Sequence, residues 1–152
     1  PYEPTLAELQ ASKKQEISAA CEQVIYSGVD VTLSDGSSEH FALTEHDQLN
    51  LFGKQVQLAA GTDKLEYHSD GQSCKYYSAA DMQTIITAAM TYVSYHTTYC
   101  NALNIWIAGV SDKDELNQIT YGASVPEQYQ SEVLKAYLAT GGDASESQTK
   151  TN

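Results

Sequence analysis

The sequence is poor in basic residues and has no long apolar run. The eight basic residues are all lysines, and they are outnumbered by twenty aspartates and glutamates, which gives a net charge of −12. Such a surface repels phosphate backbones and anionic lipid headgroups, so we expect no nucleic-acid and no membrane partner. No apolar stretch reaches the roughly 18 residues that span a bilayer, and no basic-then-apolar signal segment opens the chain. The composition is typical of a soluble globular protein.

Cysteine is also scarce. Cys21, Cys74 and Cys100 form an odd set without Cys-x-x-Cys spacing. This argues against a disulfide framework, and we expect reduced thiols in a protein made in a cytoplasm. Cys21 and Cys100 fall on apolar helical stripes, where a free cysteine acts as a small hydrophobic side chain.

Motifs that would identify an enzyme are missing. The sequence has no Gly-x-Ser-x-Gly motif, no His-Glu-x-x-His motif, no persuasive Cys–His spacing and no glycine-rich phosphate loop. The densest group of possible metal ligands consists of Glu39, His40, Glu45, His46 and Asp47. A solvated hairpin edge followed by an acidic first helical turn explains this group better than a metal site does. We therefore expect a non-enzymatic protein with no catalytic residues, no metal and no cofactor.

Signals for helices are dense. Thr5–Glu8, Thr44–Asp47 and Ser78–Asp81 each have the spacing of a helix N-terminal cap. With later caps at Ser111 and Ser124, they predict five helices. These helices begin and end at about residues 5 and 27, 44 and 61, 79 and 108, 111 and 119, and 124 and 141. The second helix has apolar residues at helical spacing, namely Leu49, Phe52, Val56 and Ala59.

Two segments between these helices predict β-hairpins, so the expected fold class is mainly α with two small β-hairpins (α+β). In the first hairpin, a three-residue loop at residues 35–37 keeps the apolar residues on one face. It places Leu33 opposite Glu39, Val31 opposite Phe41, and Val29 opposite Leu43. In the second hairpin, a two-residue turn at Asp70-Gly71 pairs Leu65 with Tyr76, Glu66 with Lys75, and Tyr67 with Cys74.

The third predicted helix is the longest and has an apolar seam in heptad steps. The seam consists of Met82, Ile86, Ala89, Val93, His96, Cys100, Leu103 and Ile107. His96 is either a core histidine bonded to a neighbour such as a tyrosine hydroxyl, or a residue that sets oligomeric state or responds to pH. An aromatic stripe runs beside this seam and consists of Tyr92, Tyr95, Tyr99 and Trp106. It is either covered by the other helices or is a partner surface. The candidate oligomer or partner surface is Tyr92, Tyr95, His96, Tyr99, Leu103 and Trp106.

Five short segments resemble a known domain family. They are Lys13–Ile17, Ala20–Cys21, Gly28–Val31, Phe41–Thr44 and Asp47–Leu51. Together they are similar to a domain family of unknown function in tailed-phage and prophage proteins, whose members often occur in or beside tail-fibre and tail-fibre-assembly genes. The resemblance covers about residues 9–108. We expect one domain over residues 1–142, with a helical extension at 109–142, followed by a flexible tail at 143–152.

The resemblance implies a structural or interaction protein of a phage tail or baseplate, assembled in the bacterial host cytoplasm and carried in the virion. Its expected partners are other phage tail proteins. The heptad seam and the tyrosine stripe beside it predict self-association, in a dimer or trimer. One alternative is a tail-fibre assembly chaperone that is absent from the mature virion. Another is a receptor-binding or small-ligand module, in which Tyr67, Tyr76 and Tyr77 would stack on a sugar or a base.

Overall fold

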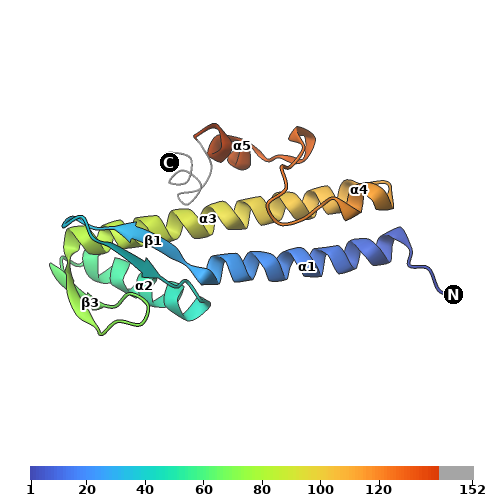
Figure 1. Cartoon of the computed structure of the whole chain (residues 1–152). Helices are drawn as coiled ribbons and strands as arrows, with labels where there is room; N and C mark the ends of the chain where they lie inside the picture. Colours follow the sequence, from blue (N-terminus) through green and yellow to red (C-terminus); the bar gives the residue numbers. More distant parts are fainter. Residues whose placement is uncertain (141–152) are drawn as a thin grey trace. The chain divides into compact units, whose positions relative to one another are not determined.

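The computed structural model describes residues 1–140 and confirms a mainly helical fold, 60% helix, with two antiparallel hairpins (Figure 1). The helices are α1 (Leu6–Ser27), α2 (Glu45–Ala59), α3 (Ala79–Gly109), α4 (Lys113–Asn117) and α5 (Glu132–Ala139), with a 3-10 turn at Glu127–Tyr129. The strands are β1 (Val29–Thr32), β2 (Ser38–Phe41), β3 (Lys64–Tyr67) and β4 (Lys75–Ser78). The predicted Gly141-Gly142 helix end and the tail at 143–152 lie outside the described residues.

The described chain divides into two compact units. One unit comprises residues 1–24 and 94–140, and we call it the helical unit. The other comprises residues 25–93, and we call it the hairpin unit, because it contains both hairpins and α2. Helix α3 is continuous and contributes residues to both.

Helix N-termini follow the predicted caps in the first half of the chain. The Thr5 hydroxyl accepts the Glu8 N–H at 3.1 Å, and Thr44 and Asp47 form a full capping box. The predicted start of the last helix at Ser124 is wrong. Helix α5 begins after Ser131, whose hydroxyl accepts the Leu134 N–H at 3.0 Å, because Pro126 has an extended backbone with ψ 144°.

The first hairpin has a different register from the predicted one. Val29 lies opposite Phe41 and Val31 opposite Glu39, a shift of two residues. The loop is residues 34–36, because Gly36 takes the left-handed conformation (φ +87°) that the third position of a three-residue hairpin loop requires. A shift of two residues preserves the alternation of faces, so the apolar residues still share one face.

The second hairpin is shifted by one residue, and this exchanges its faces. Leu65 lies opposite Tyr77, so Tyr77 is 3% exposed whereas Tyr76 is 64% exposed. The turn at Asp70-Gly71 forms, with the Gln72 N–H donating to the Ser69 carbonyl at 3.1 Å, but it does not join the strands directly. It lies inside a longer loop, residues 68–74, that is held against β2. In this loop the Asp70 N–H donates to the His40 carbonyl at 2.9 Å, and the Asp70 carboxylate accepts the Ala42 N–H at 3.0 Å.

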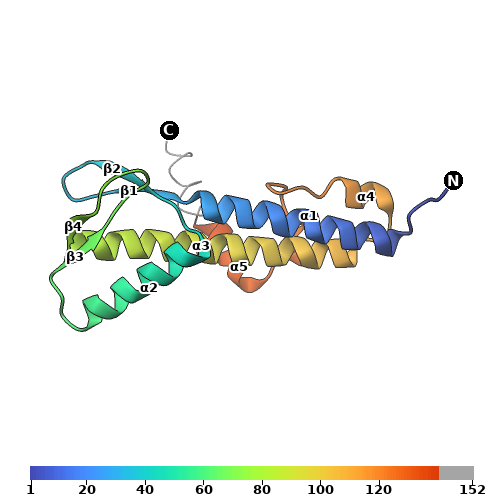
Figure 2. The same cartoon turned by 90° about the horizontal axis from the view of Figure 1, so that it is seen from below.

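Each unit has its own buried side chains. In the hairpin unit, Phe41 contacts the rings of Tyr67 and Tyr77, with centroids 5.9 and 6.1 Å away. In the helical unit, α1 lies alongside the C-terminal part of α3 in both views (Figures 1 and 2). The buried cluster there is Ile17, Tyr95, Tyr99, Ala102, Leu103, Trp106, Ile107, Val110, Leu116, Ile119, Val125 and Leu134.

Candidate functional site

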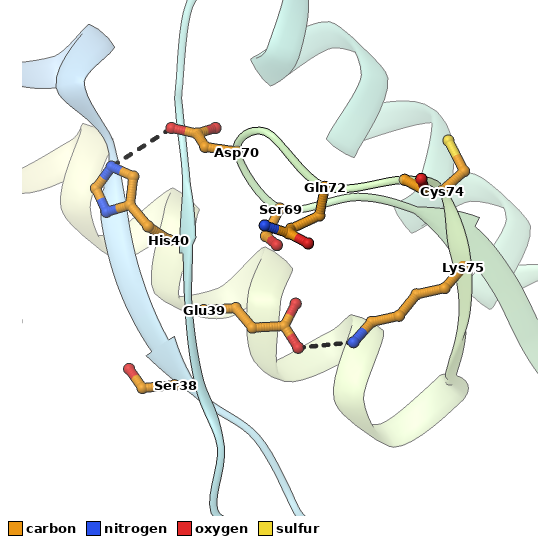
Figure 3. Close-up of a pocket in the computed structure, with 9 residues that line it drawn as sticks. Ser38, Glu39, His40, Ser69, Asp70, Gln72, Cys74 and Lys75 are labelled. Carbon is orange, nitrogen blue, oxygen red and sulfur yellow. Dashed lines mark hydrogen bonds and ion pairs between the residues drawn. The ribbon is translucent and has the colours of Figure 1, made fainter.

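A polar pocket of about 610 Å³ lies in the hairpin unit, between β2 and the loop that joins β3 to β4 (Figure 3). Asp70 holds that loop in place by bonding to the backbone of His40 in β2 and of Ala42 just after it. The lining residues are Ser38, Glu39, His40, Ser69, Asp70, Gln72, Ser73, Cys74 and Lys75.

Glu39 is the most heavily bonded side chain of this pocket. Its carboxylate accepts a hydrogen bond from Lys75 Nζ at 2.8 Å and one from Tyr77 Oη at 2.6 Å. Burial favours the neutral acid, but the bonds from Lys75, Tyr77 and the Ser69 hydroxyl outweigh it, so the pKa of Glu39 is lowered. Burial and the adjacent carboxylate raise the pKa of Tyr77. Glu39 therefore acts as an ionised anchor that joins the two hairpins.

His40 has acceptors at both ring nitrogens. Nδ1 lies 2.7 Å from the Asp30 carboxylate, and Nε2 lies 2.5 Å from the Ser27 carbonyl. Asp70 is a further carboxylate, 3.8 Å from Nε2. Burial alone would lower the pKa of His40, but these acceptors outweigh it and raise the pKa. When the ring is protonated, both of its N–H groups are engaged by these acceptors.

The charged side chains that line the pocket lie close to one another in pairs. Lys75 is paired with Glu39 at 2.8 Å, and His40 Nε2 lies 3.8 Å from the Asp70 carboxylate (Figure 3). The exposed thiol of Cys74 belongs to the same lining. Among residues 1–140, no three histidine, cysteine, aspartate or glutamate side chains gather as a metal site would require. No helix in this described range combines the length and apolar character needed to cross a bilayer.

A second candidate in the hairpin unit is the outer face of α2. Leu49, Phe52 and Val56 are 65%, 64% and 54% exposed, whereas Leu51 is fully buried. We call these three exposed residues the α2 stripe. Beside it, a shallow groove of about 440 Å³ runs between α2 and β3, where Lys54 Nζ is bonded to the Glu66 carboxylate at 2.9 Å. The groove is lined by Leu49, Asn50, Gly53, Lys54, Gln57, Glu66, Tyr67, His68 and Cys74.

The α2 stripe was missed as a site by sequence reasoning. Its spacing predicts a helix, but the same spacing marks a core face in most helices of soluble proteins. The available signal was that α2 also has Leu51 and Leu58 outside the stripe, so one helix has more apolar positions than one core face needs.

The six residues of the predicted oligomer or partner surface are buried within the chain. Their exposed fractions are Tyr92 4%, Tyr95 3%, His96 7%, Tyr99 8%, Leu103 0% and Trp106 7%. The polar atoms of three have partners in the helical unit. His96 Nδ1 lies 2.6 Å from Tyr121 Oη, Tyr99 Oη donates to the Ala123 carbonyl at 2.5 Å, and Trp106 Nε1 donates to Glu115 at 3.1 Å. His96 is thus a core histidine bonded to a tyrosine hydroxyl, one of the two arrangements predicted for it.

Comparison with known proteins identifies the family of the chain but gives no function for it. The family model described as "Domain of unknown function (DUF4376)" matches residues 8–122, which is 115 of the 152 residues. The predicted likeness to a domain family of unknown function is confirmed, and the match extends beyond α4 into the region predicted as an extension. The match carries no association with phages, so that part stays a prediction. No curated protein and no solved structure is detectably similar to the chain.

Proposed function

This chain belongs to the DUF4376 family, and we propose that it is a non-enzymatic component of a phage tail or baseplate that works through protein contacts. The phage assignment rests on the likeness of its sequence to tail-fibre-associated domains. The contact function rests on one observation, the exposed α2 stripe.

The α2 stripe has the properties of a protein-binding helix face. Leu49, Phe52 and Val56 recur at steps of three and four, so they occupy adjacent turns of one face. The other exposed large apolar residues of the described chain are spread over several elements. From Gln48 to Ala60 the only charged residue is Lys54, although the whole chain has a net charge of −12. An acidic partner, including another copy, meets little repulsion there.

The energy available from this stripe is that of part of an interface. Full burial of a leucine, phenylalanine or valine side chain gains about 1.5–3 kcal/mol. Because the three are just over half exposed, covering them gains roughly 3–5 kcal/mol in total. This is roughly a hundredfold in affinity or more, so the rest of the interface must come from neighbouring surface.

Purified particles produced by the genome that encodes this chain provide the test. Mass spectrometry should detect the protein in the particles if it is a structural component, whereas an assembly chaperone should be absent. The triple variant Leu49→Ser, Phe52→Ser, Val56→Ser should be depleted from particles by roughly a hundredfold at limiting protein concentration. Unchanged incorporation of this variant would overturn the role of the stripe.

A matched control removes the same kind of surface elsewhere. Ile105, Val133 and Leu138 are 51%, 56% and 44% exposed and lie in the helical unit. Their triple substitution by serine should leave incorporation unchanged. Equal loss in both variants would indicate a general effect of lost apolar surface. Sedimentation of the isolated protein at micromolar concentration tests the proposed dimer or trimer, which a strictly monomeric species would exclude.

The receptor-binding alternative now rests on Tyr76. Tyr67 and Tyr77 are buried against Phe41, whereas Tyr76 is 64% exposed, with Lys64 Nζ 4.4 Å from the centre of its ring. Binding to a glycan or nucleotide library that disappears in Tyr76→Ala would favour this alternative over protein contacts.

A further inference from the structure

Two of the three cysteines meet inside the helical unit. Cys21 on α1 is 7% exposed, and its thiol donates to the His96 carbonyl of α3 at 3.6 Å. That carbonyl is one helical turn before Cys100, so Cys21 faces the turn that presents the second thiol. The Cys21 and Cys100 thiols are in hydrogen-bonding contact with each other. Cys74, in contrast, is exposed and belongs to the hairpin unit.

We propose that Cys21 and Cys100 are a peroxide-sensitive dithiol that oxidises to a disulfide between α1 and α3. The Cys21 thiol lies at the turn of α3 that ends in Cys100, so an S–S bond of about 2.05 Å would join α1 and α3 at this turn. The pairing joins residues far apart in sequence, and nothing in their spacing predicts it.

The surroundings of the pair make one thiol the nucleophile. The hydrogen bond from Cys100 is the largest influence on Cys21 and, with a smaller bond from Tyr121 and the charge of His96, lowers the pKa of Cys21 to about 7. Burial and the charge of Glu22 oppose this shift. Donation to Cys21, with burial, raises the pKa of Cys100. The lowered pKa favours the thiolate at Cys21 over that at Cys100, and the thiolate is the form that reacts with peroxides.

The reaction with hydrogen peroxide proceeds in two balanced steps. The Cys21 thiolate attacks one peroxide oxygen, the O–O bond breaks, and hydroxide leaves, which gives a sulfenic acid at Cys21. The Cys100 sulfur then attacks the Cys21 sulfur, the S–O bond breaks, and the departing hydroxide takes the Cys100 proton to form water. The hydroxide from the first step takes up the proton that Cys21 released and becomes a second water. Overall, two thiols are oxidised to one disulfide and one hydrogen peroxide is reduced to two waters.

The disulfide would close a loop from residue 21 to residue 100 and restrict the unfolded chain. A reducing cytoplasm keeps such thiols reduced, and an oxidising environment favours the disulfide. A consequence that rests on the proposed function is that the bond would form after particles leave the host cell. The dithiol itself does not depend on that function.

The purified, reduced full chain treated with hydrogen peroxide tests the proposal. Intact mass should fall by two hydrogens, and peptide mapping should give a Cys21–Cys100 cross-link that dithiothreitol reverses. Cys74→Ser is the matched control and should react identically, because it removes the exposed thiol and leaves the pair. Cys21→Ser should give no intrachain bond. The oxidised Cys74→Ser protein should also melt at a higher temperature than its reduced form.

Two further readouts separate this dithiol from a pair of packed, inert thiols. The oxidation rate should rise as pH passes through about 7, following the Cys21 thiolate. In strong urea the preference for the Cys21–Cys100 pairing should disappear. A mapped bond to Cys74, oxidation of Cys74 alone, or the same pairing in urea as in buffer would each overturn the proposal.

Discussion

Substitution of Gly28 by alanine should destabilise the hairpin unit far more than the same substitution at Gly36. Both glycines have φ +87°, so both substitutions force alanine into the same left-handed conformation. The difference is in the space around them. A Cβ at Gly28 would overlap the Phe41 carbonyl oxygen and lie 2.7 Å from Ala42 Cα, whereas a Cβ at Gly36 meets nothing within 4 Å.

The two costs can be estimated separately. The left-handed conformation costs alanine about 1–2 kcal/mol, and the loss of glycine freedom in the unfolded chain returns about 0.4–1 kcal/mol. Gly36→Ala should therefore cost about 1 kcal/mol. At Gly28 the end of β2 must also move, which costs about 1–3 kcal/mol for overpacking and weakens the bond from the Leu43 N–H to the Tyr26 carbonyl, now 3.2 Å. Gly28→Ala should cost roughly 3–5 kcal/mol.

Urea unfolding of both variants measures this difference. With a slope of about 1.5 kcal/mol per molar urea, the midpoint should fall by roughly 0.5 M for Gly36→Ala and by 2 M or more for Gly28→Ala. Equal shifts in the two variants would refute the reasoning, because they would mean that the strand end yields to the new methyl group without cost.

Two other predictions use urea unfolding as well. Leu51→Ala should cost about 2–5 kcal/mol and Leu49→Ala under about 1 kcal/mol, because Leu51 is fully buried and Leu49 is 65% exposed; similar losses would contradict the orientation of α2. The raised pKa of His40 means that the folded state binds its proton more tightly, so this stabilisation is complete below pH 6.5 and is lost as pH rises through the folded pKa. His40→Gln should lose less stability than wild type as pH rises above 6.5, and parallel pH profiles would exclude this linkage.

N-terminal cap motifs correctly predicted where several helices begin, because a cap involves only a few residues that are close in sequence. The pairs Thr5–Glu8 and Thr44–Asp47 bond within one helical turn, and no distant residue competes for them. The start of the last helix was predicted less well, since Ser124 and Ser131 both offer hydroxyls and the backbone at Pro126 decides between them.

The predicted strand register was wrong where a hairpin loop bonds to another part of the chain. The second hairpin has a good two-residue turn signal at Asp70-Gly71. In the structure this turn forms inside a longer loop, in which Asp70 also bonds the backbone of His40 and Ala42, and β4 is shifted by one residue. This contact also forms the polar pocket. The register and the pocket therefore share one long-range cause, which local pairing rules do not include.

Periodicity identifies an apolar face but not what covers it, and α2 and α3 illustrate the two outcomes. The aromatic stripe of α3 looked available for partners, yet Tyr95 contacts the ring of Tyr137 on α5 at 5.4 Å and is buried. The α2 stripe has the spacing that usually marks a core face, yet Leu51 takes the buried position and the stripe stays exposed. Whether a stripe is covered depends on the neighbours that the fold brings to it. Exposure in the folded chain is therefore a better guide to a candidate contact surface than the length of a heptad seam.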